Sequence, residues 1–572
     1  MKKIISEKTE LKELTISGGD SLCAPEGMNL IMAVDGVETP IREGSYKGSI
    51  VLQPVAPIDV VHFAPTGDKV PFNFRAAVCV EDGAVTASKS GDCAVSYGEV
   101  TDSGCSNVEV TALSDEFNGI YVVNSEYTVE NAKMRLIGNG KNDYVGSGAA
   151  ILAGAGAKVT INNAEFETRG CVRPAICANA DGVVTVNNSK VFAFDGTLPE
   201  DYGWRWFSSP APGSVMMECP WMLGNLGNNR GTMLTGSATA TYNNCHIRAQ
   251  GWGALGVDMA HGGRLTVNNC LIESTDCGYG AYADGDVIDT FSGSTVNAAD
   301  YGVIIGGGVV VLTDETVVNS RRFGVMAHDQ GLNYLQPDYG RLVVEKGSEI
   351  NSEFAAIQIK NASISVEVNG ARLNPKNGLL LEVMENDDPF NVALKETLEK
   401  DPDADPTVGG MFKPMEDIKY TVSDGNDDID AVFRNVDLNG DMVISALKYC
   451  GLNVRLENAK LNGAITSATA VHDVAPDGDS LKMEESSRLW YLIGMQKATY
   501  APVEGKYEAR ASLDAESVWT VARTSYLNGL SIEAGAVVKA PEDRKLVMEV
   551  DGVDTAIKPG SYAGRISLIV TE

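Results

Sequence analysis

Trp252-Gly-Ala-Leu-Gly-Val-Asp258 is the first of five similar phrases that lie between residues 236 and 360. Each phrase has an aromatic residue, then glycine or alanine, then an apolar run, and most end in an acid or a histidine. The other four are Tyr279-Gly-Ala-Tyr-Ala-Asp284-Gly-Asp286, Tyr301-Gly-Val-Ile-Ile-Gly306, Phe323-Gly-Val-Met-Ala-His328-Asp329 and Phe354-Ala-Ala-Ile-Gln-Ile-Lys360. Their leading aromatic residues are 27, 22, 22 and 31 residues apart. A period of this length is typical of a solenoid, in which each repeat is one turn and neighbouring turns share a core.

A second repeated phrase, ending in two asparagines, marks the corners of these turns. It occurs as Val159-Thr-Ile-Asn-Asn163, Val184-Thr-Val-Asn-Asn188, Ala240-Thr-Tyr-Asn-Asn244 and Leu265-Thr-Val-Asn-Asn269. Asparagine tolerates the left-handed backbone that a sharp corner needs, and stacked asparagines can hydrogen-bond from turn to turn. In these phrases the chain resembles the right-handed parallel β-helix proteins of the pectin-lyase-like superfamily, over residues 118–382 and 430–470. We therefore expect an all-β fold, a right-handed parallel β-helix solenoid.

The cysteines follow the same repeat. Cys245 and Cys270 each come directly after an Asn-Asn pair, where Ala164 and Ser189 stand in other turns. The eleven cysteines include no Cys-x-x-Cys pair. This pattern indicates small residues stacked inside the solenoid, and it favours buried free thiols over disulfides or metal ligands.

The two ends of the chain are copies of one β-rich module. Residues 11–52 align without a gap to residues 527–568, at a constant offset of 516, with half of the positions identical. Both copies alternate apolar and polar residues and carry Asp-Gly steps that suit hairpin turns. The modules either cap the open ends of the solenoid or join chains into a homo-oligomer, for instance an antiparallel dimer, and the two roles are compatible.

The sequence thus divides into six parts. They are an N-terminal module (1–55, duplicated in 527–572), an irregular β cap (56–117), the β-helix with an aromatic insertion (118–382, insertion 196–235), a partly helical insertion (383–429), further β-helix turns with a connection (430–520), and the C-terminal module (521–572). The aromatic insertion contains three of the six tryptophans, Trp204, Trp206 and Trp221. It is either a lid over a groove, or a small packed appendage or dimer contact.

The ends of the aromatic-led phrases bring reactive side chains into register. Neighbouring turns of a parallel β-helix lie about 4.8 Å apart, so residues at one place in successive turns form a column. Alignment on the leading aromatic residues puts Asp258, Asp284, Gly306 and His328 in nearly one column, with His261, Asp286 and Asp329 beside it. We predict that the six ionisable residues of this set are catalytic, because crowded carboxylates favour a division into acid and base.

The middle turn of this column has no side chains, since it reads Gly306-Gly307-Gly308. A ligand would then fit between Asp284 and His328, which lie two turns or roughly 9.6 Å apart. That separation is near the upper end of the one that lets water attack a glycosidic carbon with inversion. The predicted substrate-binding residues are Tyr282, Lys360, Trp204, Trp206 and Trp221.

Known enzymes of the superfamily match this column only loosely. The pectin hydrolases carry aspartates, a Gly-His-Gly histidine and an Arg-Ile-Lys segment on consecutive turns. This chain has Asp258, Asp284-Gly-Asp286, His328 and Gln358-Ile-Lys360. It lacks the Asn-Thr-Asp signature and the arginine, and His328 lies one turn later than in that pattern. The pectate lyases bind calcium through acids and use a basic residue as the base, for which the nearest candidates here are Arg321-Arg322. Neither activity transfers residue by residue.

Net charge and the distribution of apolar residues limit the partners and the location that we expect for the protein. The formal net charge of −31 makes nucleic acid or an anionic membrane surface an unfavourable partner. The charged start, Met-Lys-Lys-Ile-Ile-Ser-Glu, lacks the apolar core of a signal peptide, and no later run is long enough to span a bilayer. We expect a cytoplasmic protein, unless a signal peptide has been removed.

Two functions remain open. The first is an enzyme that uses Asp and His acid–base chemistry on a hydroxyl-rich substrate (a carbohydrate, a glycoside or a phenolic small molecule) in a lateral groove, by hydrolysis, elimination or isomerisation. No nucleotide-binding motif points to a redox cofactor, and a calcium ion stays open as an alternative although the acidic segments do not match an EF-hand. The second function is a non-catalytic β-helix protein of binding, surface or adhesin type.

Overall fold

The computed structural model describes residues 2–63, 69–198, 227–328, 340–360, 364–384, 428–445, 451–472, 494–503 and 508–572. These residues are almost entirely β-strand, and the helical part is one 3-10 turn, Asp92–Ala94. The chain forms two compact units, Met1–Ala281 and the part from Tyr282 on, which are described separately. The described part contains no helix whose length and hydropathy would let it cross a membrane.

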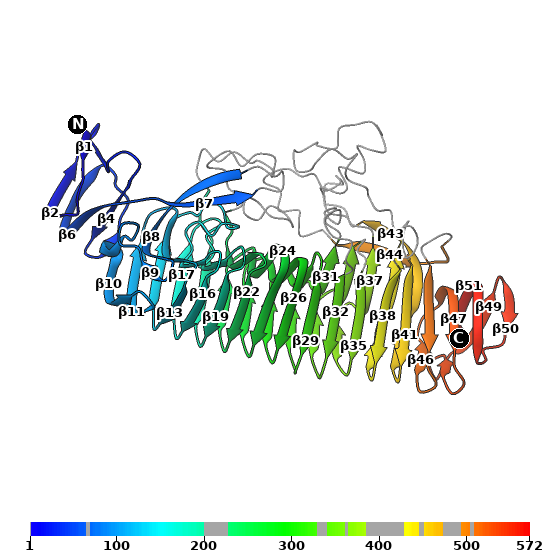
Figure 1. Ribbon diagram of the computed structural model, residues 1–572. Helices are drawn as coiled ribbons and strands as arrows, with labels where there is room; N and C mark the ends of the chain where they lie inside the picture. Colours follow the sequence, from blue (N-terminus) through cyan, green and yellow to red (C-terminus); the bar gives the residue numbers. More distant parts are fainter. Residues whose placement is uncertain are drawn as a thin grey trace. The chain divides into compact units, whose positions relative to one another are not determined.

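Each turn in the first unit contributes strands to three parallel sheets, and Figure 1 shows these turns following one another in sequence order. The first sheet contains β8 (Lys69–Glu81), β12 (Phe117–Val123), β15 (Ile151–Ala153), β18 (Ile176–Ala178), β21 (Arg230–Gly236) and the start of β24 (Gly253–Asn268). The second contains the start of β11 (Gly104–Ala112), β13 (Glu126–Glu130), β16 (Lys158–Asn162), β19 (Val183–Asn187), β22 (Thr239–Asn243) and the end of β24. The third contains the end of β11, β14 (Lys133–Ile137), β17 (Glu165–Arg169), β20 (Lys190–Phe194), β23 (His246–Ala249) and β25 (Leu271–Ser274).

The second unit repeats this plan. Its first sheet contains β26 (Tyr279–Ser292) from Tyr282 on, β28 (Tyr301–Ile305), β31 (Phe323–His328), β34 (Ile357–Lys360), β37 (Leu379–Met384), β40 (Asp441–Ser445) and β43 (Ile465–His472). The second contains the end of β26, β29 (Val309–Thr313), β32 (Gly340–Glu345), β35 (Ile364–Asn369), β38 (Ile429–Arg434), β41 (Leu452–Glu457) and β45 (Ala509–Leu513). The third contains β27 (Thr295–Ala298), β30 (Val317–Ser320), β33 (Glu349–Ser352) and β36 (Arg372–Pro375), followed by a separate sheet of β39 (Asp437–Asn439), β42 (Lys460–Gly463), β46 (Val518–Val521) and β48 (Val537–Lys539).

These pairings confirm the predicted all-β solenoid. The segment 56–117 is more regular than expected, because it contains the long hairpin of β7 (Ile58–Phe63) with β8 and the hairpin of β10 (Val95–Thr101) with β11. Nearly all of the partly helical insertion expected at 383–429 lies outside the described residues, as does most of the aromatic insertion.

The three sheets differ in burial. Strands of the second and third sheets alternate between buried and more exposed residues, as in a sheet with one face toward solvent. In β16, Val159 and Ile161 are buried while Lys158 and Thr160 are not. Strands of the first sheet, such as β28 and β31, are buried at every position. In the first unit the hairpin residues Phe72 and Phe74 belong to one apolar cluster with first-sheet residues, including Tyr121, Leu152 and Met233. The first sheet is therefore covered on its outer face as well as its inner face.

Asparagine ladders hold the corners together, as the sequence predicts. Asn187 Nδ2 donates to Asn162 Oδ1 (2.9 Å), and Asn243 and Asn268 continue the ladder with bonds of 2.8 Å each. The second asparagine of each phrase has a left-handed backbone, for example φ 53° at Asn163. Each such bond contributes about 1 kcal/mol, so the ladders stabilise the stack in small increments.

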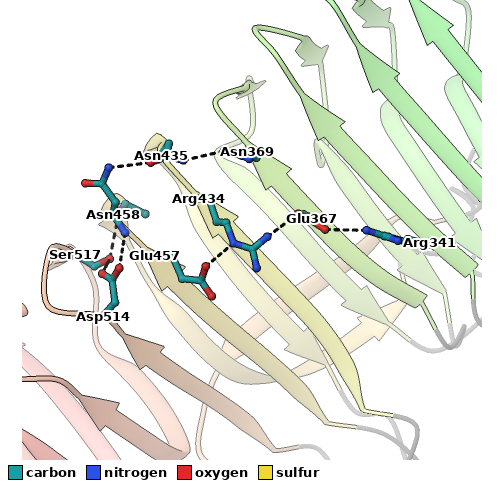
Figure 2. A network of polar contacts seen from close by, with 10 residues as sticks. Arg341, Glu367, Asn369, Arg434, Asn435, Glu457, Asn458, Asp514 and Ser517 are labelled. Atoms are coloured by element: carbon teal, nitrogen blue, oxygen red, sulfur yellow. Dashed lines mark hydrogen bonds and ion pairs between the residues drawn. The ribbon is translucent and has the colours of Figure 1, made fainter.

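Figure 2 shows a second corner, in the other unit, where two kinds of ladder lie side by side. Asn458 donates to Asn435, and Asn435 donates to Asn369, each over 2.9 Å. Beside them Arg434 bridges Glu367 and Glu457, and Arg341 bonds Glu367 at 3.0 Å. These ions are partly exposed, so each pair contributes at most about 1 kcal/mol.

The stacking of small residues is also as expected. The Cys245 backbone N–H donates to Cys270 Sγ (3.2 Å), and the Ala164 N–H donates to Ser189 Oγ (3.0 Å) in the matching place. All nine cysteines in the described part of the chain are free thiols.

One inward position of the second unit carries a carboxyl group. Asp289 lies opposite Val310 in the second sheet, where neighbouring turns carry Val310 and Leu342 inward, and it is 0% exposed. Neither carboxyl oxygen has a hydrogen-bond partner among the described residues. Burial raises the pKa of Asp289 well above its ordinary value. The side chain is therefore neutral in the folded protein over a wider pH range than in the unfolded chain.

We predict that Asp289→Val raises the free energy of unfolding by about 1–3 kcal/mol at neutral pH, because it removes a buried polar group without a partner. Below about pH 3.9 the carboxyl is neutral in both states, and stability falls as the pH rises from there toward the raised folded pKa. The gain should thus be larger at neutral pH than at about pH 4. Denaturant unfolding of both proteins at the two pH values measures it, and a loss of stability at neutral pH would contradict the assignment.

Candidate functional site

The register of the first sheet in the second unit forms a column of reactive side chains. His328 lies opposite Lys360, and Lys360 lies opposite Met384. Ile305 pairs with Ala327, which sets Gly306 beside His328. The Gly306 N–H donates to the Ala283 carbonyl (2.7 Å), which sets Gly306 beside Asp284. The order in space is therefore Asp284, Gly306, His328, Lys360, with steps of about 4.8 Å. We call these four residues the column.

The column residues are deeply buried. Asp284 is 7% exposed, His328 2% and Lys360 0%. Each of the three makes further polar or electrostatic interactions. The structure thus brings together three of the predicted site residues, but beneath cover and not on the floor of an open groove. The lateral groove predicted from the sequence is therefore not exposed at these three residues.

A second row of side chains points out of the same face two residues earlier in each strand. It includes Tyr282, whose ring centroid lies 6.2 Å from that of His328, together with Gln358 and Glu382, which face each other in register. Gln358 Nε2 donates to Glu382 Oε2 (2.9 Å) and to the Gly494 carbonyl (2.9 Å). Gln496, on β44 (Gln496–Tyr500), donates to Glu382 Oε1 (3.0 Å). The strand β44 and the residue Gly494 therefore form part of the cover over this face.

The other predicted residues are placed differently. Asp286 is exposed and lies past the end of the first-sheet part of β26, at the turn into the second sheet. Asp258 and His261 lie on β24, but their side chains are outside the description. Asp329, Trp204, Trp206 and Trp221 lie outside the described residues. Their predicted roles are therefore untested.

The column combines three kinds of chemistry. Asp284 offers a carboxyl group, His328 an imidazole and Lys360 an amine, and the glycine between the first two adds no side chain. A carboxyl and an imidazole on either side of a glycine can act as a general acid and a general base, and an amine can stabilise a developing negative charge. Within the described residues no group of three or more His, Cys, Asp or Glu side chains is placed to hold a metal ion.

The first unit contains a buried ion pair that no sequence pattern indicates. Arg230 Nε lies 2.7 Å from Asp143 Oδ2, and both side chains are 0% exposed. The Arg230 guanidinium also lies over the Trp252 ring at 4.1 Å. Burial raises the pKa of Asp143, and the charge of Arg230 opposes this rise. Because 87 residues separate the partners and Asp143 lies in a loop without repeat phrases, no periodic pattern reveals the contact.

A third carboxyl group has an unusual environment. Burial raises the pKa of Asp195 to about 6. Its oxygens accept hydrogen bonds from Asn228 Nδ2 (2.7 Å) and from the Asn229 backbone N–H (2.9 Å). Asn229 in turn donates to the Arg173 carbonyl. Asp195 therefore organises the chain around residue 228, and it has a structural reason to be buried.

We predict that Arg230→Met lowers the free energy of unfolding by about 3–5 kcal/mol, since it leaves the Asp143 carboxyl without its buried counter-charge. Adding Asp143→Leu should restore most of that loss, because the apolar pair needs no desolvation of charge. Thermal and denaturant unfolding of the single and double variants measure this coupling. Additive losses in the double variant would show that the two residues do not act as a pair.

Comparisons with known proteins leave the family open. No protein-family model matches this chain, and no curated protein matches it. Among solved structures it is similar to the tailspike protein gp49 from Pseudomonas phage LKA1, with 9% identity over 99% of this chain and 78% of that chain and a TM-score of 0.16. The fold assignment as a parallel β-helix therefore rests on the strand pairings themselves.

Proposed function

We propose that this protein is an enzyme that performs acid–base chemistry on a hydroxyl-rich substrate at the column. The observation that carries the proposal is the register of four first-sheet strands, which lines up Asp284, Gly306, His328 and Lys360. Burying a carboxyl, an imidazole and an amine in one place costs stability, and such cost is typical of functional sites.

Each member has a distinct role in this proposal. Asp284 and His328 lie two strands apart, roughly 9.6 Å between backbones, and the column residue between them, Gly306, has no side chain. One would remove a proton while the other supplies one, as hydrolysis, elimination and isomerisation all require. Lys360, in register with His328, would stabilise negative charge on the substrate. Tyr282 would offer its ring face beside His328.

The burial of the column favours a small substrate. Side chains that are 0–7% exposed do not line an open cleft for the middle of a polymer, so we propose a monosaccharide, a glycoside, a phenolic compound or the end of an oligosaccharide as the substrate. The enclosed column also favours strong electrostatic effects, because water is excluded from it.

We predict that Asp284→Asn and His328→Gln each lower kcat/KM by about 100-fold or more, because general acid–base groups contribute 100- to 10,000-fold. A panel of glycosides, oligosaccharides and phenolic glycosides, with products followed by mass spectrometry, identifies a substrate for the measurement. Asp437→Asn, an exposed acid remote from the first sheet, is the matched control and should leave kcat/KM unchanged. Melting curves show that each variant is folded.

Two results would contradict the proposal. One is unchanged turnover in folded Asp284→Asn and His328→Gln. The other is the absence of turnover for the whole panel together with ligand binding that neither variant weakens, which would favour the non-catalytic alternative.

A further inference from the structure

The two terminal modules have the same strands in the same order. In the N-terminal copy these are β1 (Lys2–Ile4), β2 (Thr9–Ile16), β3 (Ser21–Cys23), β4 (Asn29–Val34), β5 (Val37–Glu38) and β6 (Gly44–Val55). In the C-terminal copy they are β46, β47 (Ser525–Ile532), β48, β49 (Lys545–Val550), β50 (Val553–Thr555) and β51 (Gly560–Thr571). The pairing Lys2↔Ser21 in β1–β3 has its equivalent in Val518↔Val537 in β46–β48, at the offset of 516 residues. The duplication therefore includes a turn of solenoid, formed by β1 to β3 in one copy and β46 to β48 in the other. The antiparallel strands of the module follow this turn in the chain.

Side-chain contacts inside the two copies agree as well. The Tyr46 hydroxyl donates to the Arg42 carbonyl (2.9 Å), and the Tyr562 hydroxyl donates to the Lys558 carbonyl (2.8 Å). Asp35 accepts the Ser49 N–H (2.8 Å), as Asp551 accepts the Arg565 N–H (2.9 Å). The copies are thus the same module, and a contact made by one is a guide to the other.

In the C-terminal copy, the first two strands of the module pair with the rest of the solenoid. There β46 pairs in parallel with β42, and β47 pairs in parallel with β45, so that the module stacks on the preceding turn of the solenoid. Among the described strands of the N-terminal copy, β1 pairs with β3 alone and β2 pairs with β6 alone. The edge equivalent to the stacked one carries Ile4, which is 58% exposed.

The opposite side of the module is used in the N-terminal copy. There β5 pairs in parallel with β11, through Val37↔Thr111 and Glu38↔Ala112. The Glu38 carboxylate is buried and accepts the backbone N–H of Ser114 (3.1 Å). In the C-terminal copy, among the described strands, β50 pairs with β49 alone. Its Val553, the equivalent of Val37, is 65% exposed.

We propose that the module is a two-sided connector and that a second copy of this chain occupies its free side. The first turn of one copy, β1 to β3, would stack on β50 of the preceding copy. This joins two edges, one of each kind, that pair with no further strand among the described residues. The contact is heterologous, since different surfaces of the two copies meet, and it repeats from copy to copy.

The chemistry of the two edges supports this occupant. Each of these strand edges presents an exposed apolar residue, Ile4 or Val553, beside charged residues. Lys2 and Lys3 on β1 are exposed and positively charged, and Asp554 on β50 is exposed and negatively charged. Asp554 stands at the position of Glu38, which in the N-terminal copy accepts the backbone N–H groups of Leu113 and Ser114, directly after the docked strand β11. Strand pairing, apolar contact and charge therefore favour the same partner.

Sedimentation of the full chain over a concentration series tests the proposal. We expect reversible association, weakened at least tenfold by Val553→Lys and by Ile4→Lys, because each places a charge on an edge that must desolvate. Val183→Lys, an outward position on the second sheet of the solenoid, is the matched control and should associate like the wild type. A strictly monomeric chain, or association that neither edge variant weakens, would overturn the proposal.

A directional cross-link separates this contact from a symmetric dimer. Chains carrying Val553→Cys are mixed with chains carrying Ile4→Cys, and the linked peptides are identified by mass spectrometry. A disulfide between positions 553 and 4 of different chains supports the head-to-tail contact. A 553–553 or 4–4 linkage as the main product would contradict it.

Discussion

The parallel pairing of the first-sheet strands is the constraint on which the rest of the second unit depends. A slip of one residue would turn every side chain of a strand to the opposite face, so that His328 would point into the core. Glycines at the second position of the aromatic-led phrases fix this register. A Cβ at Gly324 would lie 2.5 Å from the Ala356 carbonyl, and one at Gly302 would lie 2.3 Å from that of Gly324. The aromatic residues before them stack, with Tyr301 and Phe323 at 5.9 Å and Phe323 and Phe354 at 5.5 Å.

Buried polar groups in this protein have two kinds of explanation. Arg173 is fully buried, but its guanidinium donates to four backbone carbonyls, including those of Gly148 and Phe117, and so it holds successive turns together. Asp143 and Arg230 compensate each other's charge. The column differs because three different ionisable groups converge on one row around a residue without a side chain. We propose the column as the catalytic site because these three groups converge, and not because they are buried.

Much of the fold could be predicted from the sequence because each turn of a solenoid repeats the same pattern of strand and corner residues. The Thr-Val-Asn-Asn phrases predict the second-sheet strands and their corners, and the aromatic-led phrases predict the first-sheet strands, including the alignment of Asp284, Gly306 and His328. The covering of the first sheet could not be predicted, since its outer face is buried by segments that share no period with the turns. The hairpin β7–β8 is one such segment. The Asp143–Arg230 pair could not be predicted either, since Asp143 lies in a loop outside the repeats. Asp289 could not be predicted because it occupies an inward position that other turns fill with Val or Leu.

The register of His328 against Lys360 is the central claim about the site, and a pair of cysteines measures it directly. Backbones of paired strands lie about 4.8 Å apart, within the range that a disulfide can bridge. Oxidation of a chain carrying His328→Cys and Lys360→Cys should link these two positions, as shown by mass spectrometry of the peptides. A chain carrying His328→Cys and Ile359→Cys should not form the link, because the two side chains point to opposite faces. Linkage in the second chain and not in the first would show that the strand is slipped by one residue, and the column would not exist.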